Sequence, residues 1–167
     1  MRYLTVLTLA LLLLAPAQAE PPASAGRDPF RAEKGYSVTG HTFRADFPGK
    51  IVMEQKAPGI VKYYAHDKSD SSLYGVAVFT GSQKRHMADL KRYLIKQGIK
   101  ALEDVSHRDV HIGTVKGIEF QGIDRQGTPM TIRLYVDQDH SYVVAASGFD
   151  LSKNRNFVES FRIRGQK

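Results

Sequence analysis

The sequence contains no cysteine among its 167 residues. Disulfide bonds, cysteine nucleophiles, covalent haem attachment and thiolate metal sites are therefore excluded. Small exported domains often depend on disulfide bonds, so this chain must instead be stabilised by the burial of apolar groups and by hydrogen bonds. Apolar residues make up 42% of the chain and charged residues 25%. That balance is typical of a globular protein and argues against a disordered or membrane-embedded class.

Long apolar runs are also scarce, and the most prominent one stands at the N-terminus. Arg2 precedes a mostly apolar run over residues 4–15, and the triplet Ala17-Gln18-Ala19 follows Pro16. This order is typical of a secretory signal peptide, so we predict a signal peptide over residues 1–19 that is cleaved after Ala19. The run is shorter than the roughly 20 residues of a spanning helix, so no transmembrane anchor is predicted. We expect an exported protein, periplasmic or secreted.

Motifs of several enzyme classes are missing as well. The chain has neither the Gly-x-Ser-x-Gly elbow of many serine hydrolases nor a Walker or Rossmann glycine-rich loop. Ser82 precedes a predicted helix and is interpreted as its N-cap, while Ser147 is interpreted as a packing position in an apolar strand. The sequence therefore predicts no catalytic residue and no cofactor.

The six histidines do not predict a metal site. His107 and His111 are four residues apart, which along a strand is about 13 Å and too far for one metal ion. The others are isolated or fall in separate predicted strands, at His41, His66, His86 and His140. Paired acids lie in or beside predicted turns and are interpreted as solvated loop residues. These acids are Asp67 with Asp70, Glu103 with Asp104, and Asp137 with Asp139.

The rest of the chain is organised as a leader and one domain. Residues 20–34 are rich in proline and charge without an apolar period, so they predict a flexible leader, and residues 35–167 predict a single domain. Phe43, Ala45 and Phe47 alternate with polar residues, as in a half-buried strand. Similar patterns predict strands over residues 51–55, 61–66, 73–79, 105–112, 117–124, 130–136 and 142–149. In residues 130–136 the alternation predicts one core face and one wet face.

Two helices complete the predicted fold. Met87, Leu90 and Leu94 form one apolar stripe in an amphipathic helix over residues 83–97, and a short helix is predicted over 153–160. These elements predict an α+β fold: a single antiparallel β-sheet with one long amphipathic helix and a short C-terminal helix, packed mainly on one face. The residues predicted to be buried are Phe47, Val76, Val78, Phe120, Ile132, Leu134 and Val144.

Several local sequences resemble the PsbP-like group, which is named for an extrinsic subunit of photosystem II and includes many small exported bacterial proteins. The matching segments are residues 43–49 (FRADFPG), the strand-to-helix passage over 74–98, residues 142–146 (YVVAA) and residues 157–162 (FVESFR). The resemblance implies a PsbP-like fold and, in photosynthetic members, a non-catalytic assembly role. No photosystem contact or metal site carries over onto residues of this chain.

Five basic residues supply a candidate binding surface. In a helix over residues 83–97 they fall within about 140° of one another, opposite the apolar stripe, and only Asp89 interrupts them. They are Lys84, Arg85, Lys91, Arg92 and Lys96. Together with a net charge of +7, this face predicts contact with an anionic envelope component or an acidic protein. An ordinary solvated helix face is the alternative interpretation.

Two functions of different classes remain open. The sequence favours an exported, non-catalytic binding or accessory module that contacts an anionic partner through the basic helix face. The alternative is a small exported enzyme, a hydrolase whose site is assembled from loops. A concave pocket with convergent polar groups of perturbed pKa would favour the enzyme. No specific nucleic-acid motif is predicted.

Overall fold

The computed structural model describes residues 37–39, 42–96, 107–123 and 127–165. The predicted signal peptide and leader, residues 1–34, lie outside these ranges. The strands within them are β1 (Ser37–Thr39), β2 (Phe43–Asp46), β3 (Ile51–Ala57), β4 (Ile60–Asp67), β5 (Ser72–Thr80), β6 (His107–Ile112), β7 (Val115–Ile123), β8 (Pro129–Val136), β9 (His140–Ser147) and β10 (Arg162–Ile163). The helices are the 3-10 turn η1 (Gly81–Gln83), α2 (Met87–Lys96) and α3 (Leu151–Ser160).

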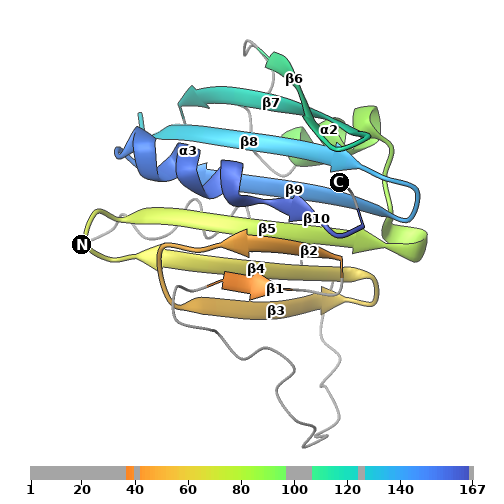
Figure 1. The fold of residues 1–167 in the computed structure, drawn as a ribbon, viewed down its shortest axis with the longest axis horizontal. Coiled ribbons are helices and arrows are strands. Elements are labelled where there is room, and N and C mark those ends of the chain that lie inside the picture. The colour runs from red at the N-terminus through yellow and green to blue at the C-terminus, as the bar shows by residue number, and fades with distance from the viewer. Residues whose placement is uncertain (1–36, 40–41, 97–106, 124–126, 166–167) are drawn as a thin grey trace, which may run out of the picture.

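The described strands form two antiparallel sheets. The large sheet has seven strands in the order β3-β4-β5-β9-β8-β7-β6, and at its centre Val76 of β5 is opposite Val144 of β9. The small sheet has the order β1-β2-β10, and Phe43 near the start of the domain is opposite Ile163 near its end. Figure 1 shows the small sheet and α3 in front of the large sheet, with α2 behind it.

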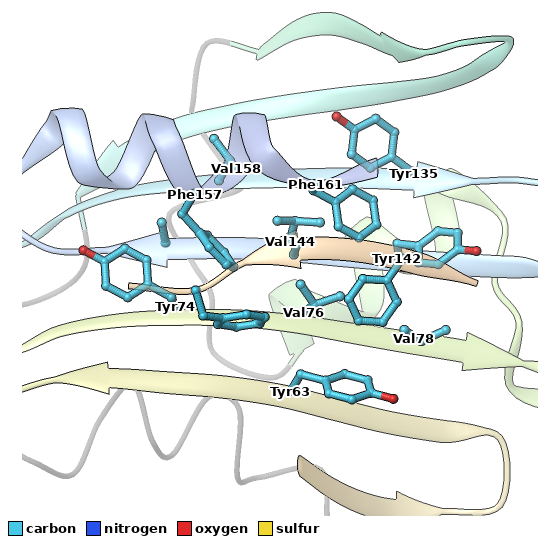
Figure 2. Packing of buried hydrophobic residues seen from close by; sticks show 14 of the residues in the cluster. Tyr63, Tyr74, Val76, Val78, Tyr135, Tyr142, Val144, Phe157, Val158 and Phe161 are labelled. Atoms are coloured by element: carbon cyan, nitrogen blue, oxygen red, sulfur yellow. The ribbon is translucent and has the colours of Figure 1, made fainter. Parts of the chain in front are cut away.

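One face of the large sheet is covered by α3 and the small sheet, and its core is rich in aromatic residues. Figure 2 shows Phe157 and Phe161, from the C-terminal half of α3 and the residue after it, directed toward the strands. The Phe157 ring lies 5.3 Å from that of Tyr74, and the Phe161 ring lies 5.7 Å from Tyr135 and 5.6 Å from Tyr142. Through these ring contacts the C-terminal part of the chain packs on the central strands and completes the core on this face of the large sheet.

The opposite face of the large sheet carries α2 and a second core. Successive side chains of a strand point to opposite faces, so Ile132 and Leu134 of β8 face away from α3. They pack in one cluster with Phe79 and with Leu90 and Leu94 of α2, which are 0% and 5% exposed. The apolar stripe predicted for the helix is therefore the surface by which α2 docks.

The predicted fold class is wrong about the number of sheets and about the faces that the helices cover. The sequence predicts one sheet with a long and a short helix mainly on one face, but the protein is mostly β, with two sheets and two ten-residue helices on opposite faces of the larger one. The physical reason is visible in β8, where the face predicted to be wet carries buried Arg133 and Tyr135. Because both faces of the central strands are apolar or internally paired, both need cover.

The predicted core is confirmed. Each of the seven residues expected to be buried is at most 6% exposed: Phe47, Val76, Val78, Phe120, Ile132, Leu134 and Val144. Within the described residues, the predicted strands and the C-terminal helix are present with ends shifted by a few residues, and β1 and β10 were not predicted. Two-residue alternation thus locates the buried positions even where it misplaces the layers.

The start of α2 differs from the prediction. Lys84 has extended dihedrals (φ −57°, ψ 139°), and the first helical hydrogen bond runs from the Leu90 amide to the carbonyl of His86, at 2.8 Å. Ser82 lies in η1, so its interpretation as the N-cap of α2 is wrong. The backbone amide of Arg85 donates to Ser141 Oγ at 2.7 Å, and this contact holds the segment outside the helix.

A buried ion pair occupies the α3 side of β7 and β8. Glu119, 1% exposed, accepts hydrogen bonds from Arg133 Nε at 2.6 Å and from Arg108 Nε at 2.8 Å. Arg133 also donates to the carbonyl of Val158 near the end of α3, at 3.0 Å. Burial opposes ionisation of Glu119, but the hydrogen bonds from both arginines outweigh it and hold its pKa below the usual range. The pair links the sheet to α3.

Gly117 of β7 is expected to tolerate no side chain. A Cβ there would lie 2.4 Å from Cδ1 of buried Tyr135 and 2.6 Å from the carbonyl oxygen of Leu134. Overpacking of this kind costs about 1–3 kcal/mol, so Gly117→Ala should lower the free energy of unfolding in urea by that amount. Gly49→Ala is the matched control, because its Cβ would meet nothing closer than His66 O at 3.5 Å. Equal stability of the two variants would contradict the packing of β7 on β8.

Candidate anion-binding site

A surface hollow of about 300 Å³ lies where the chain enters α2. Its lining comes from the segment before the helix and from the first two turns of the helix. The residues that line it are Lys84, Arg85, His86, Asp89, Arg92 and Tyr93. Three lining side chains are basic and one is a carboxylate, so the formal charges of Lys84, Arg85, Arg92 and Asp89 sum to +2.

The segment before α2 is pinned to the strand β9. The backbone amide of Arg85 donates to Ser141 Oγ at 2.7 Å, and the Ser141 hydroxyl donates to the carbonyl of Arg85 at 3.0 Å. Ser141 is fully buried at the start of β9, and Lys84 Nζ donates to the carbonyl of Gln138 in the preceding turn. The positions of the first two cations are therefore set by strand β9 and its turn, not by helix geometry.

The Arg85 side chain packs on an aromatic ring. Its guanidinium carbon lies 4.0 Å from the centroid of the Tyr93 ring, within the range of a cation–π contact. The Nε atom of Arg85 is buried there and has no hydrogen-bond partner. Burial raises the pKa of Tyr93, and the positive charge of Arg85 only partly opposes this. The Tyr93 ring meets Phe79 edge to face at 6.0 Å, which ties the hollow to the core under α2.

Arg92 and Asp89 complete the hollow from the helix. Arg92 Nη1 lies 2.9 Å from Asp89 Oδ1, and the two side chains are 66% and 51% exposed. An exposed pair of this kind contributes at most about 1 kcal/mol, so Arg92 can exchange Asp89 for another anion at little cost.

The structure separates the five basic residues predicted to form one helix face. Lys84, Arg85 and Arg92 meet at the hollow, although the first two precede α2. Lys91 instead places its ammonium 5.3 Å from the centroid of the Phe120 ring, over strand β7. Lys96 ends α2, and its side chain lies outside what the structure describes. His86 and Tyr93 were not predicted as site residues, because a helix over 83–97 would put neither among the basic side chains.

The remaining histidines are spread over the molecule. His107 and His111 lie four residues apart in strand β6, as the distance argument against chelation assumed. His140 Nδ1 lies 3.3 Å from Asp137 Oδ1. Among the described residues, no group of three histidine, aspartate or glutamate side chains could hold a metal ion. His41 lies outside the described ranges.

The paired acids hold turns together. Asp67 and Asp70 each lie 3.1 Å from the ammonium of Lys153, and hydrogen bonds from Ser69, followed by that from Lys153, lower the pKa of Asp67 to about 2. Asp137 Oδ1 accepts from the backbone amides of Asp139 and His140. Asp67, Asp70 and Asp137 are therefore paired or hydrogen-bonded at their turns and not merely solvated, whereas Asp139 is exposed as expected. Glu103 and Asp104 lie outside the described ranges.

Comparison with known proteins adds no assignment. No family model matches this sequence, and no curated protein matches it. The resemblance to the PsbP-like group therefore stays a prediction. In the part of the chain that the structure describes, no helix has the length and hydropathy needed to cross a membrane.

Proposed function

We propose that this chain is an exported, non-catalytic binding module that holds an anionic partner at the hollow beside α2. The observation that carries the proposal is the convergence of Lys84, Arg85 and Arg92 on one concave surface. Cations gathered in a hollow focus their field, whereas the same charges spread over a convex helix are screened separately by water and salt. The export signal in residues 1–19 would deliver this surface to the anionic components of a cell envelope.

The attachment of the hollow to the core supports a binding role. Arg85 is held through both of its backbone polar groups by Ser141, and its guanidinium rests on Tyr93. A cation that is already positioned loses less conformational entropy when a ligand binds. The acids described above hold turns or pair with Lys153, so they give no support to the hydrolase alternative.

Binding to anionic vesicles tests the proposal. The purified protein is expected to sediment with vesicles that contain anionic phospholipid and not with purely zwitterionic ones. Removing two charges in a Lys84→Gln, Arg92→Gln double variant should weaken binding by about 2 kcal/mol, or about 30-fold, because each basic residue near such a surface contributes about 1 kcal/mol. Raising the salt concentration should weaken binding in parallel.

The matched control removes the same charge elsewhere. Lys68 in the β4–β5 turn and Arg155 on α3 are both exposed, and α3 lies on the opposite face of the large sheet from α2. A Lys68→Gln, Arg155→Gln double variant should therefore retain most of the binding. If the control variant loses as much affinity for anionic vesicles as the hollow variant, or if the wild type does not bind anionic vesicles, the hollow is not the binding site.

A further inference from the structure

We propose that the group bound in the hollow is a compact tetrahedral dianion of the phosphate type, carried as a phosphomonoester. This inference rests on the proposed function and names its ligand class. A flat anionic surface touches the residues that protrude furthest, but the three cations of this site line a concavity of about 300 Å³. A phosphate group is small enough to enter such a space and be approached from several sides.

The donors of the hollow suit a tetrahedral oxyanion. Arg85 and Arg92 each offer a planar fork of N–H groups, a geometry that matches two oxygens of one phosphate. Lys84 has three ammonium donors, of which the carbonyl of Gln138 takes one. Ser141 fixes the backbone of Arg85 and the Tyr93 ring orients its guanidinium, so this cation is positioned before the ligand arrives.

The start of α2 adds to this set. The bond from the Leu90 amide to the carbonyl of His86 is the first of the helix, so the amide of Asp89, which lines the hollow, is one of three at this helix end that have no intrahelical acceptor. The positive end of the helix dipole lies at the same place, between His86 and Asp89 of the lining. Exposed backbone donors beside cationic side chains form a common phosphate-binding arrangement.

The charge balance favours a dianion. The hollow has three cations and one carboxylate, so a phosphomonoester neutralises it, while an acetate-like carboxylate leaves one positive charge uncompensated. Asp89 opposes any anion and occupies Arg92 at 2.9 Å. Removal of the Asp89 charge should therefore strengthen binding, and a gain of affinity cannot be produced by a variant that merely misfolds.

Calorimetric titration of the purified protein with inorganic phosphate and acetate at equal ionic strength tests the inference. Phosphate should bind at least about tenfold more tightly than acetate, a difference of about 1.4 kcal/mol. Lys84→Gln with Arg92→Gln should weaken phosphate binding by tenfold or more, and Asp89→Asn should strengthen it severalfold. Phosphate binding that is no tighter than acetate binding, or that Asp89→Asn leaves unchanged, would overturn the inference.

Competition distinguishes this inference from the proposed function and separates two sources of the same chemistry. Inorganic phosphate and the soluble ester glycerol 3-phosphate should displace the protein from anionic vesicles if the hollow takes a phosphate group. If the protein binds vesicles with phosphomonoester headgroups more tightly than phosphodiester vesicles of equal charge, the phosphate group is carried by a lipid. If it binds only glycerol 3-phosphate tightly, the phosphate group is carried by a soluble ligand. Vesicle binding that neither soluble phosphate affects would refute the phosphate site and leave the anionic-surface function standing.

Discussion

Replacing Glu119 with methionine is expected to lower the free energy of unfolding by about 3–5 kcal/mol, because it leaves the buried guanidinium of Arg133 without its carboxylate. Arg133 is 9% exposed, and its other acidic neighbour, Glu159, is 3.9 Å away and itself half exposed. Chemical denaturation in urea would measure the loss. Asp46→Asn is the control, since the Arg44–Asp46 pair is exposed and 3.7 Å long and should contribute at most about 1 kcal/mol.

A double-mutant cycle separates the ion pair from general packing. If the cost of Glu119→Met comes from an unpaired buried charge, adding Arg133→Met should recover much of the stability, because two apolar side chains of similar length replace two charges. Recovery will be incomplete, since Arg133 also donates to the carbonyl of Val158. A double variant that costs the sum of the two single variants would show that the pair is not energetically coupled.

The same pair makes a defined contribution to acid sensitivity. The pKa of Glu119 in the folded protein lies below its unfolded value, which is about 4.3, so ionised Glu119 stabilises the fold above that pH. This contribution is lost as the pH falls through the folded pKa. The difference in stability between wild type and Glu119→Gln should therefore shrink on acidification below about pH 4.

Local sequence patterns were sufficient to predict the buried core residues but not to predict that both faces of the large sheet are covered. The apolar stripe of Leu90 and Leu94 and the alternation in β8 depend on neighbours a few residues away, and both located buried positions correctly. The burial of Arg133 could not be predicted, because its partner Glu119 lies 14 residues earlier in another strand. A charged residue in an alternating pattern indicates a wet face unless that partner is known, so the second covered face was missed.

The hollow shows the same limit. Its two most fixed residues, Lys84 and Arg85, were predicted as basic site residues but placed on a helix that begins only at Met87. The Ser141 hydroxyl that keeps Arg85 out of the helix lies 56 residues away, so no local signal marked this bend. The basic residues of the site could therefore be predicted from the sequence, whereas their concave arrangement could be seen only in the folded structure.

Truncating Leu94 to alanine is expected to cost about 2–5 kcal/mol, because the side chain is 5% exposed and packs in the core under α2, whose members include Phe79 and Leu134. Leu94→Met keeps most of the apolar volume and should cost less than about 1.5 kcal/mol. Arg92→Ala is a control on the same helix, since its side chain is 66% exposed and its pair with Asp89 is a surface contact.

The Leu94 variant also tests whether the hollow depends on the docking of α2. Tyr93 and Arg92 belong to the helix, whereas Arg85 is attached to β9 and Lys84 to the turn before it, so a helix that loosens from the sheet separates the two halves of the site. At a temperature where Leu94→Ala is still folded by circular dichroism, its affinity for phosphate should fall while that of Leu94→Met stays near wild type. If Leu94→Ala matches wild type in unfolding free energy, α2 is not docked through this residue. If it loses stability but keeps its full affinity for phosphate, the hollow does not require the docked helix.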